Sequence, residues 1–200
     1  MSYVIPKLFM VFDCESVGLH GETYAVGWCL INRAGRLIAE WCDACDPAKA
    51  EGDDVGRDWL GANAPMPAMG YNARSPYDVR HEFWKAWRAA EEQGAVLVAD
   101  CAWPVEARFL AACVDDHTLA RGWEGPYPLH DLASIRLAAG LDPLGTEERL
   151  PDELPVHCPL ADAKQSARLL VEALNRLCPA KEGGSEPIWD DTSTDYDRGE

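Results

Sequence analysis

The stretch Leu8–Glu15, LFMVFDCE, constrains the fold of this chain more than any other. Five consecutive apolar residues precede two acids that stand one residue apart, Asp13 and Glu15. A short apolar run bounded by charge is typical of a buried strand, and alternate side chains of a strand lie on the same face. The two carboxylates therefore point the same way and repel one another unless a divalent cation lies between them. The alternative interpretation is a strand that ends in an ordinary polar loop.

Composition and charge narrow the class of protein. The chain has 200 residues, of which 48% are hydrophobic and 26% are charged. This composition fits one globular domain with a substantial core, or a domain plus a short tail. Its formal net charge of −16 predicts a surface that repels long nucleic-acid duplexes. We therefore expect any phosphate-bearing substrate to be short or single-stranded, or to be reached through bound metal and local basic residues.

The first residues do not form a signal-peptide pattern, because Pro6 and Lys7 interrupt them and the apolar run ends at Asp13. No apolar run approaches membrane-spanning length. We expect a soluble, cytoplasmic protein with no membrane partner. Cys42 and Cys45 have a zinc-like spacing, but no second pair of cysteines or histidines stands at a matching distance, so zinc is not expected there.

Three predicted strands open the chain, over 8–15, 25–32 and 37–44, and they form an antiparallel meander. Residues 45–77 are rich in Gly, Pro, Asn and Asp and have no hydrophobic period, so they are interpreted as a long loop of the kind that often binds or covers a substrate. Four large side chains in this loop either pack it down, which we favour, or stack on a base: Trp59, Met66, Met69 and Tyr71.

The second half of the chain alternates between helical and strand patterns. Helical spacing indicates helices over 78–93, from Pro104 onward, over 130–140 and from Pro159, with strands over 95–99 and near 127–129. Residues 179–200 are Gly, Ser and acid, and are predicted to be a disordered acidic tail after a domain of residues 1–178. This order indicates an α/β fold, a mixed sheet of a three-stranded antiparallel meander plus parallel strands, with helices on both faces.

A histidine and an aspartate stand together near the other end of the chain. His157 lies just before the last predicted helix and Asp162 lies in its first turn. The positive end of the helix helps to keep Asp162 ionised, and a solvent-facing histidine is suited to take a proton from water. The alternative is a capping histidine beside a solvated aspartate.

Taken together, these motifs resemble the DEDDh (DnaQ-like) family of 3′→5′ exonucleases, which includes oligoribonuclease, ribonuclease T and proofreading exonuclease domains. The likeness rests on D-x-E at the end of the first strand, followed by Ser16 and Gly18, and on H-x-x-x-x-D at the last helix. It covers about residues 7–177. The resemblance implies a ribonuclease-H-like fold and hydrolysis of phosphodiester bonds.

The resemblance also implies a set of site residues. Asp13, Glu15 and Asp162 would bind two divalent cations, Mg²⁺ or Mn²⁺, and His157 would be the general base. Ser16 and Gly18 would lie on the substrate side of the site. Asp131 falls where the family often has an acidic residue that opens a helix beside the site, so it would be a third residue on the substrate side. Family members are often homodimers, so a homodimer is a further implication.

The middle motif departs from the family pattern. The family carries an aspartate three residues before a Phe-Leu pair, and the residue at that position here is Glu106. We favour Glu106 as the remaining catalytic metal ligand. Asp100, at the end of the predicted strand 95–99, is the alternative; if neither binds metal, the second ion is lost.

Two functions of different classes follow. The first is a metal-dependent 3′→5′ exonuclease acting on single-stranded or short nucleic acid, with RNA slightly favoured over DNA because the surface is acidic. The second is a catalytically inactive exonuclease-fold interaction module. Retention of Asp13, Glu15, His157 and Asp162 in one chain argues against the second.

Overall fold

Strand β1 (Leu8–Ser16) is the central strand of a five-stranded mixed sheet in the computed structural model, which describes residues 6–65, 67 and 70–178. The strand order is β3-β2-β1-β4-β5. Pairing is antiparallel within the β1–β2–β3 meander and parallel between β1, β4 and β5. The other strands are β2 (Thr23–Asn32), β3 (Leu37–Ala44), β4 (Ala95–Ala99) and β5 (His130–Asp131). The predicted meander and mixed sheet are confirmed.

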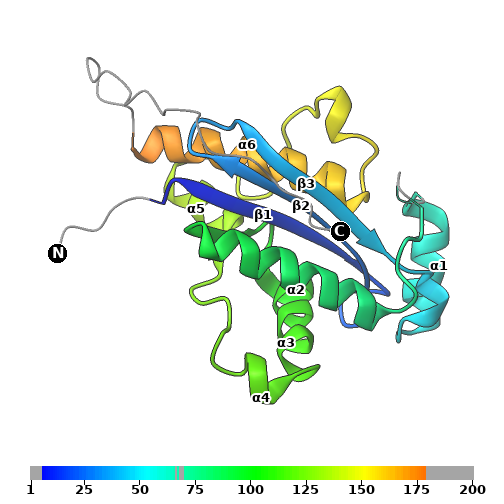
Figure 1. Cartoon of the computed structure of the whole chain (residues 1–200). Coiled ribbons are helices and arrows are strands. Elements are labelled where there is room, and N and C mark those ends of the chain that lie inside the picture. The colour runs from blue at the N-terminus through cyan, green and yellow to red at the C-terminus, as the bar shows by residue number, and fades with distance from the viewer. Residues whose placement is uncertain (1–5, 66, 68–69, 179–200) are drawn as a thin grey trace.

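Helices cover both faces of the sheet, as predicted (Figure 1). The longer helices are α2 (Pro76–Glu92) and α3 (Ala107–Asp115) on one face, and α5 (Leu132–Ala138) and α6 (Pro159–Leu177) on the other. Met10 and Phe12 of β1 pack in the core under α2 and α3, whereas Phe9 and Val11 pack in the core under α5 and α6. Because side chains alternate along a strand, Asp13 and Glu15 continue the row that faces α6.

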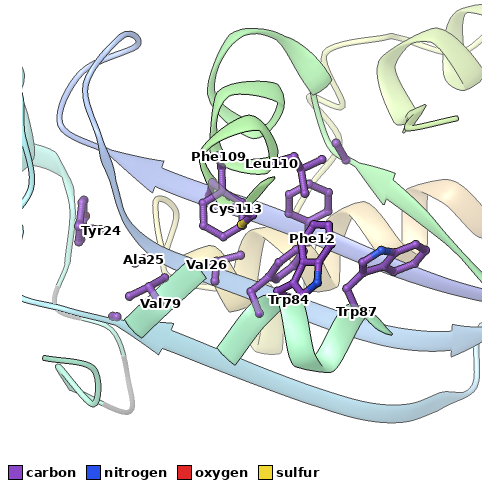
Figure 2. Packing of buried hydrophobic residues seen from close by; sticks show 14 of the residues in the cluster. Phe12, Tyr24, Ala25, Val26, Val79, Trp84, Trp87, Phe109, Leu110 and Cys113 are labelled. Carbon is purple, nitrogen blue, oxygen red and sulfur yellow. The ribbon is translucent and has the colours of Figure 1, made fainter. Parts of the chain in front are cut away.

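Aromatic packing fixes β1 against α2 and α3. The ring centroid of Phe83 lies 5.1 Å from that of Phe12 and 5.0 Å from that of Phe109, and all three side chains are buried. Figure 2 shows Phe12 and Phe109 in this core, with Trp84 beside them. Aromatic side chains that interlock in this way limit the relative movement of the elements that carry them. The start of α3 is therefore held at the end of β1.

A glycine allows α6 to lie directly on the sheet. Gly27 of β2 pairs with Asp13 of β1. A β-carbon at Gly27 would lie 2.2 Å from the backbone nitrogen of Leu160 and 2.3 Å from the carbonyl carbon of Pro159, closer than real β-carbons approach other atoms. The first turn of α6 therefore packs against the backbone of β2, beside Asp13.

The prediction of an unstructured loop over 45–77 is wrong, because the segment contains a 3₁₀ turn, η1 (Pro47–Lys49), and helix α1 (Asp54–Asn63). Asp53 caps α1 by accepting a hydrogen bond of 2.7 Å from the backbone N–H of Gly56. Gly56 weakens the helical pattern of the sequence, but a β-carbon there would lie 2.7 Å from the backbone nitrogen of Gly18. Met66 and Met69 lie outside the described residues.

Three further boundaries differ from the prediction. Pro104 lies inside a wide, π-type turn, η2 (Ala102–Glu106), because Trp103 has extended φ and ψ angles, and the regular helix α3 starts at Ala107. The short strand β5 lies at His130–Asp131 rather than near 127–129, so α5 begins at Leu132. Two short elements complete the fold, α4 (Thr118–Arg121) and the 3₁₀ turn η3 (Pro151–Glu153).

The predicted tail over 179–200 lies outside the described residues, and the division into a domain and a tail stays a prediction. Within the described ranges, no helix is both long enough and apolar enough to cross a membrane.

The contact at Gly27 generates a first prediction. Gly27→Ala forces either β2 or the first turn of α6 to move, and we expect it to lower the free energy of unfolding by about 1–3 kcal/mol, as overpacking does. Gly61→Ala, in α1, is the matched control, because a β-carbon there meets no atom within 4 Å. Urea unfolding measures both variants. Equal stability of Gly27→Ala and the unsubstituted protein would contradict the close contact.

Candidate active site

Five carboxylates from four separate segments converge at the ends of β1 and β4. Phe12 pairs with Ala99 in the parallel ladder, so Asp13 and Asp100 each follow the last pair. The five residues are Asp13 and Glu15 at the end of β1, Asp100 after β4, Glu106 at the end of η2, and Asp162 in the first turn of α6. The pKa of Asp13 is raised well above its ordinary value, first by burial and then by the charges of the other four residues. The structure thus brings these five predicted acids together in space.

Burial and mutual repulsion make it unfavourable for all of these carboxylates to be ionised at the same time. Burial, followed by the charges of Asp162 and Glu106, raises the pKa of Glu15 to about 8. Burial is also the main cause that raises the pKa of Glu106, to about 7. Ligand atoms of Glu15, His157 and Asp162 lie within 4.8 Å of one another. Oxygen-rich clusters of this kind are the donor sets that hard divalent cations prefer, so the residues fit such an ion.

Glu106 is the acid most closely tied to the end of β1. Its side chain is buried, and its Oε1 accepts a hydrogen bond of 3.4 Å from the backbone N–H of Cys14, which stands between Asp13 and Glu15. Among the neighbouring charges that raise the pKa of Asp13, the charge of Glu106 has the largest effect.

Asp100 has a different environment. Its Oδ1 accepts a hydrogen bond of 2.9 Å from the hydroxyl of Ser166, one turn beyond Asp162 on α6. Its charge has the smallest of the four effects on the pKa of Asp13. Asp100 therefore lies within the cluster but is held toward α6, whereas Glu106 is held toward β1.

Asp162 has a basic partner. Arg149 donates a hydrogen bond from Nη1 to Oδ1 of Asp162, and the same nitrogen donates to the backbone carbonyl of Glu153 at 2.9 Å. Burial raises the pKa of Asp162, although Arg149 and His157 act in the opposite direction. Burial and like charge thus outweigh the ion pair at this position.

The backbone of His157 is in a left-handed conformation, with φ of 58°, and no other non-glycine residue in the described part of the chain has a positive φ. Such conformations are strained and are concentrated at functional sites. The imidazole packs edge-on against the indole of Trp59 on α1, with 4.9 Å between the ring centroids. The strained backbone and Trp59 together place the imidazole beside Glu15 and Asp162.

The residues predicted to contact substrate have local structural partners. The hydroxyl of Ser16 donates to the carbonyl of Gly18 at 2.8 Å, and Gly18 has a φ of 76° that favours glycine. Asp131 caps α5 by accepting from the backbone N–H of Ser134, and it also accepts from the backbone N–H of Ala102, each at 3.0 Å. Asp131 therefore joins α5 to η2. Its contact with substrate stays a prediction.

Sequence patterns missed three residues that shape the site. Ser166 stands four residues after Asp162, and helical spacing alone places both on one face of α6. Arg149 belongs to a run of charged residues, and Gly27 lies within a strand; neither carries a motif that points to the site. Their roles depend on contacts made after folding.

Comparison with solved structures reveals the fold. The chain is similar to a full-length 3′-exonuclease, with a TM-score of 0.50 and 15% identity, over 88% of this chain and 84% of that one. The likeness shows the fold. The chain also resembles the zinc-bound form of E. coli ExoI in complex with single-stranded DNA, with a TM-score of 0.50 and 13% identity, over 88% of this chain but 42% of ExoI. No protein-family model and no curated protein sequence matches the chain.

The raised pKa values predict how the stability of the metal-free protein depends on pH. A folded-state pKa of about 8 for Glu15, against an ordinary 4.5, means that the folded protein holds this proton more tightly than the unfolded chain does. The contribution of this proton to the free energy of unfolding is complete below pH 4.5 and is lost as the pH rises toward 8. We expect Glu15→Gln to lose less stability than the unsubstituted protein between pH 6 and pH 8.5, by on the order of 1–3 kcal/mol.

Urea unfolding in EDTA at the two pH values measures this difference. Glu82→Gln is the control, because Glu82 is half-exposed and pairs with Lys85 on α2, away from the acidic cluster. Parallel pH dependence of Glu15→Gln and the unsubstituted protein would contradict the account.

Proposed function

We propose that this protein is a metal-dependent 3′→5′ exonuclease that hydrolyses phosphodiester bonds of single-stranded or short nucleic acid. The observation that carries the proposal is the convergence of Asp13, Glu15, Glu106 and Asp162 into one buried cluster beside His157. The fold shared with a 3′-exonuclease and with ExoI supports it.

In this proposal Asp13, Glu15, Glu106 and Asp162 hold two divalent cations, Mg²⁺ or Mn²⁺. The zinc ion in the ExoI structure supports a role for divalent metal in this fold. When bound, such ions supply an activated water and stabilise the leaving oxygen. The donor set of four carboxylates suits hard ions such as Mg²⁺ and Mn²⁺.

His157 is proposed as the general base. Its imidazole lies beside Glu15 and Asp162, where the attacking water would be oriented, and it would accept the proton of that water. The contact with Trp59 restricts rotation of the imidazole. Trp59 is 43% exposed as a residue, so a terminal base can stack on its indole while the cleaved bond lies at the cluster.

The proposed substrate follows from charge. A net charge of −16 opposes binding of a long duplex, because each additional phosphate adds repulsion. A short or single strand that enters from one end presents few phosphates at a time. The single-stranded DNA in the ExoI complex supports this class of substrate, and we propose RNA as slightly preferred over DNA. Ser16 and Gly18 would line the substrate side of the cluster.

An oligonucleotide assay tests the proposal. The purified protein with Mg²⁺ or Mn²⁺ is expected to shorten a 5′-labelled single-stranded RNA or DNA stepwise from its 3′ end, and EDTA is expected to stop the reaction. Asp13→Asn keeps the size of the side chain but removes its charge, and activity is expected to fall by 10²-fold or more, a typical cost for loss of a catalytic group, of order 10²–10⁴. Asp78→Asn is the control, because Asp78 is a partly exposed acid in the first turn of α2 that pairs with Arg74 rather than with the cluster.

Two outcomes would contradict the proposal. The first is that neither RNA nor DNA is shortened under these conditions. The second is that Asp13→Asn is as active as the control. Absence of shortening together with absence of heat on titration with Mn²⁺ would favour the interaction module.

Glu106 and Asp100 are distinguished by paired substitutions. Glu106→Gln is expected to lower activity by about 10²-fold or more and to reduce the number of Mn²⁺ ions bound from two to one, because Glu106 is the acid coupled most strongly to Asp13. Asp100→Asn is expected to lower activity by less than about tenfold, since its carboxylate already has Ser166 as a partner. Activity assays and Mn²⁺ titration measure both, and the reverse order of effects would assign the ligand to Asp100.

A further inference from the structure

Arg149 brings a positive charge to the acidic cluster. Its Nη1 lies against Oδ1 of Asp162, and the two side chains are 23% and 12% exposed. The guanidinium of an arginine carries a full positive charge in proteins. In the metal-free protein, Arg149 therefore neutralises part of the repulsion within the cluster.

Arg149 is held in place by a support that does not depend on Asp162. The same Nη1 donates to the backbone carbonyl of Glu153 in η3, at 2.9 Å. The carboxylate of Glu153 is buried and accepts hydrogen bonds from the guanidinium of Arg168 at 2.6 and 2.7 Å and from the backbone N–H of Leu150 at 2.9 Å. Because Arg168 lies on α6, the segment that carries Arg149 is fastened to the same helix that carries Asp162.

A divalent cation at this cluster would compete with Arg149. Asp162 contributes one of the ligand atoms that lie within 4.8 Å of those of Glu15 and His157, and Arg149 already binds an oxygen of Asp162. A guanidinium and a divalent cation on one carboxylate repel each other strongly where water is largely excluded. The guanidinium of Arg149 and a divalent cation therefore weaken each other's binding to Asp162.

We propose that Arg149 is the internal counter-ion of the metal site and that binding of a divalent cation displaces it from Asp162. This inference rests on the proposed function, since it assumes that the cluster binds metal. Arg149 stabilises the metal-free fold and weakens the affinity for metal. After displacement, the carbonyl of Glu153 keeps the guanidinium at the edge of the site.

Titration of the metal-free, full-length protein with Mn²⁺ in calorimetry tests the proposal, at about 0.15 M salt to screen long-range charge. Arg149→Gln is expected to bind Mn²⁺ about three- to tenfold more tightly than the unsubstituted protein, and Arg149→Lys, which keeps the charge, less than twofold more tightly, in line with the strength of partly exposed ion pairs. Arg74→Gln is the matched control: it removes the same charge from a side chain that is 92% exposed and pairs with Asp78, and its affinity is expected to stay unchanged.

Unfolding temperatures provide a second measurement. In EDTA, Arg149→Gln is expected to unfold at a lower temperature than the unsubstituted protein. In saturating Mn²⁺ this difference is expected to become smaller, because only the hydrogen bond to the carbonyl of Glu153 is then lost. A purely structural role for Arg149 would lower the unfolding temperature equally in both conditions and would overturn the proposal.

The outcomes separate this proposal from the one on which it rests. Equal Mn²⁺ affinity of Arg149→Gln and the unsubstituted protein overturns the role of Arg149 and leaves the exonuclease intact. If no variant binds Mn²⁺, the proposed function and the role of Arg149 both fail.

Discussion

Repulsion among buried carboxylates is the constraint on which this structure depends. Asp13 and Glu15 are fixed on one face of β1, while Glu106 and Asp162 are brought to them from positions far along the chain. A cluster that is desolvated and carries only like charge is unfavourable unless protons or cations neutralise it. The raised pKa values and the ion pair with Arg149 are two responses to the same cost. The divalent cations of the proposed function would be a third, and they would also provide the chemistry.

The rest of the fold supplies the rigidity that this arrangement needs. Interlocked aromatic rings hold β1 and α3 together, and this packing fixes Glu106 at the end of η2. On the other face, the absence of a side chain at Gly27 lets α6 reach the backbone of β2, which fixes Asp162. Stabilising free energy from apolar burial on both faces thus offsets the repulsion at the end of the sheet.

Much of the fold could be predicted because its signals are local. The apolar run before Asp13, the alternation in the meander and the helical stripe after Pro159 each arise from neighbouring residues, and the structure has the corresponding strands and helix. Helix α1 was missed because Gly56, which close packing against Gly18 requires, also weakens the local helical signal. Contacts between residues far apart in the chain, such as Gly18 and Gly56, cannot be predicted from such local patterns.

The candidate site could be predicted in part. The spacing of Asp13, Glu15, His157 and Asp162 within a strand and at a helix start is itself a signal, and the structure brings these four residues together. The environments of Glu106 and Asp100 and the contact of Arg149 depend on which side chain reaches which in the folded chain. Asp100 and Glu106 are six residues apart in the sequence, and they have different partners because β4 is followed by the irregular turn η2.

A crystal of the protein soaked in Mn²⁺ tests the central claim most directly, because the anomalous scattering of manganese locates each ion. The account predicts manganese between Asp13, Glu15 and Asp162, with Glu106 within reach of a second ion and Arg149 withdrawn from Asp162. Manganese bound elsewhere, or a cluster that stays free of manganese while Arg149 keeps its contact with Asp162, would contradict it.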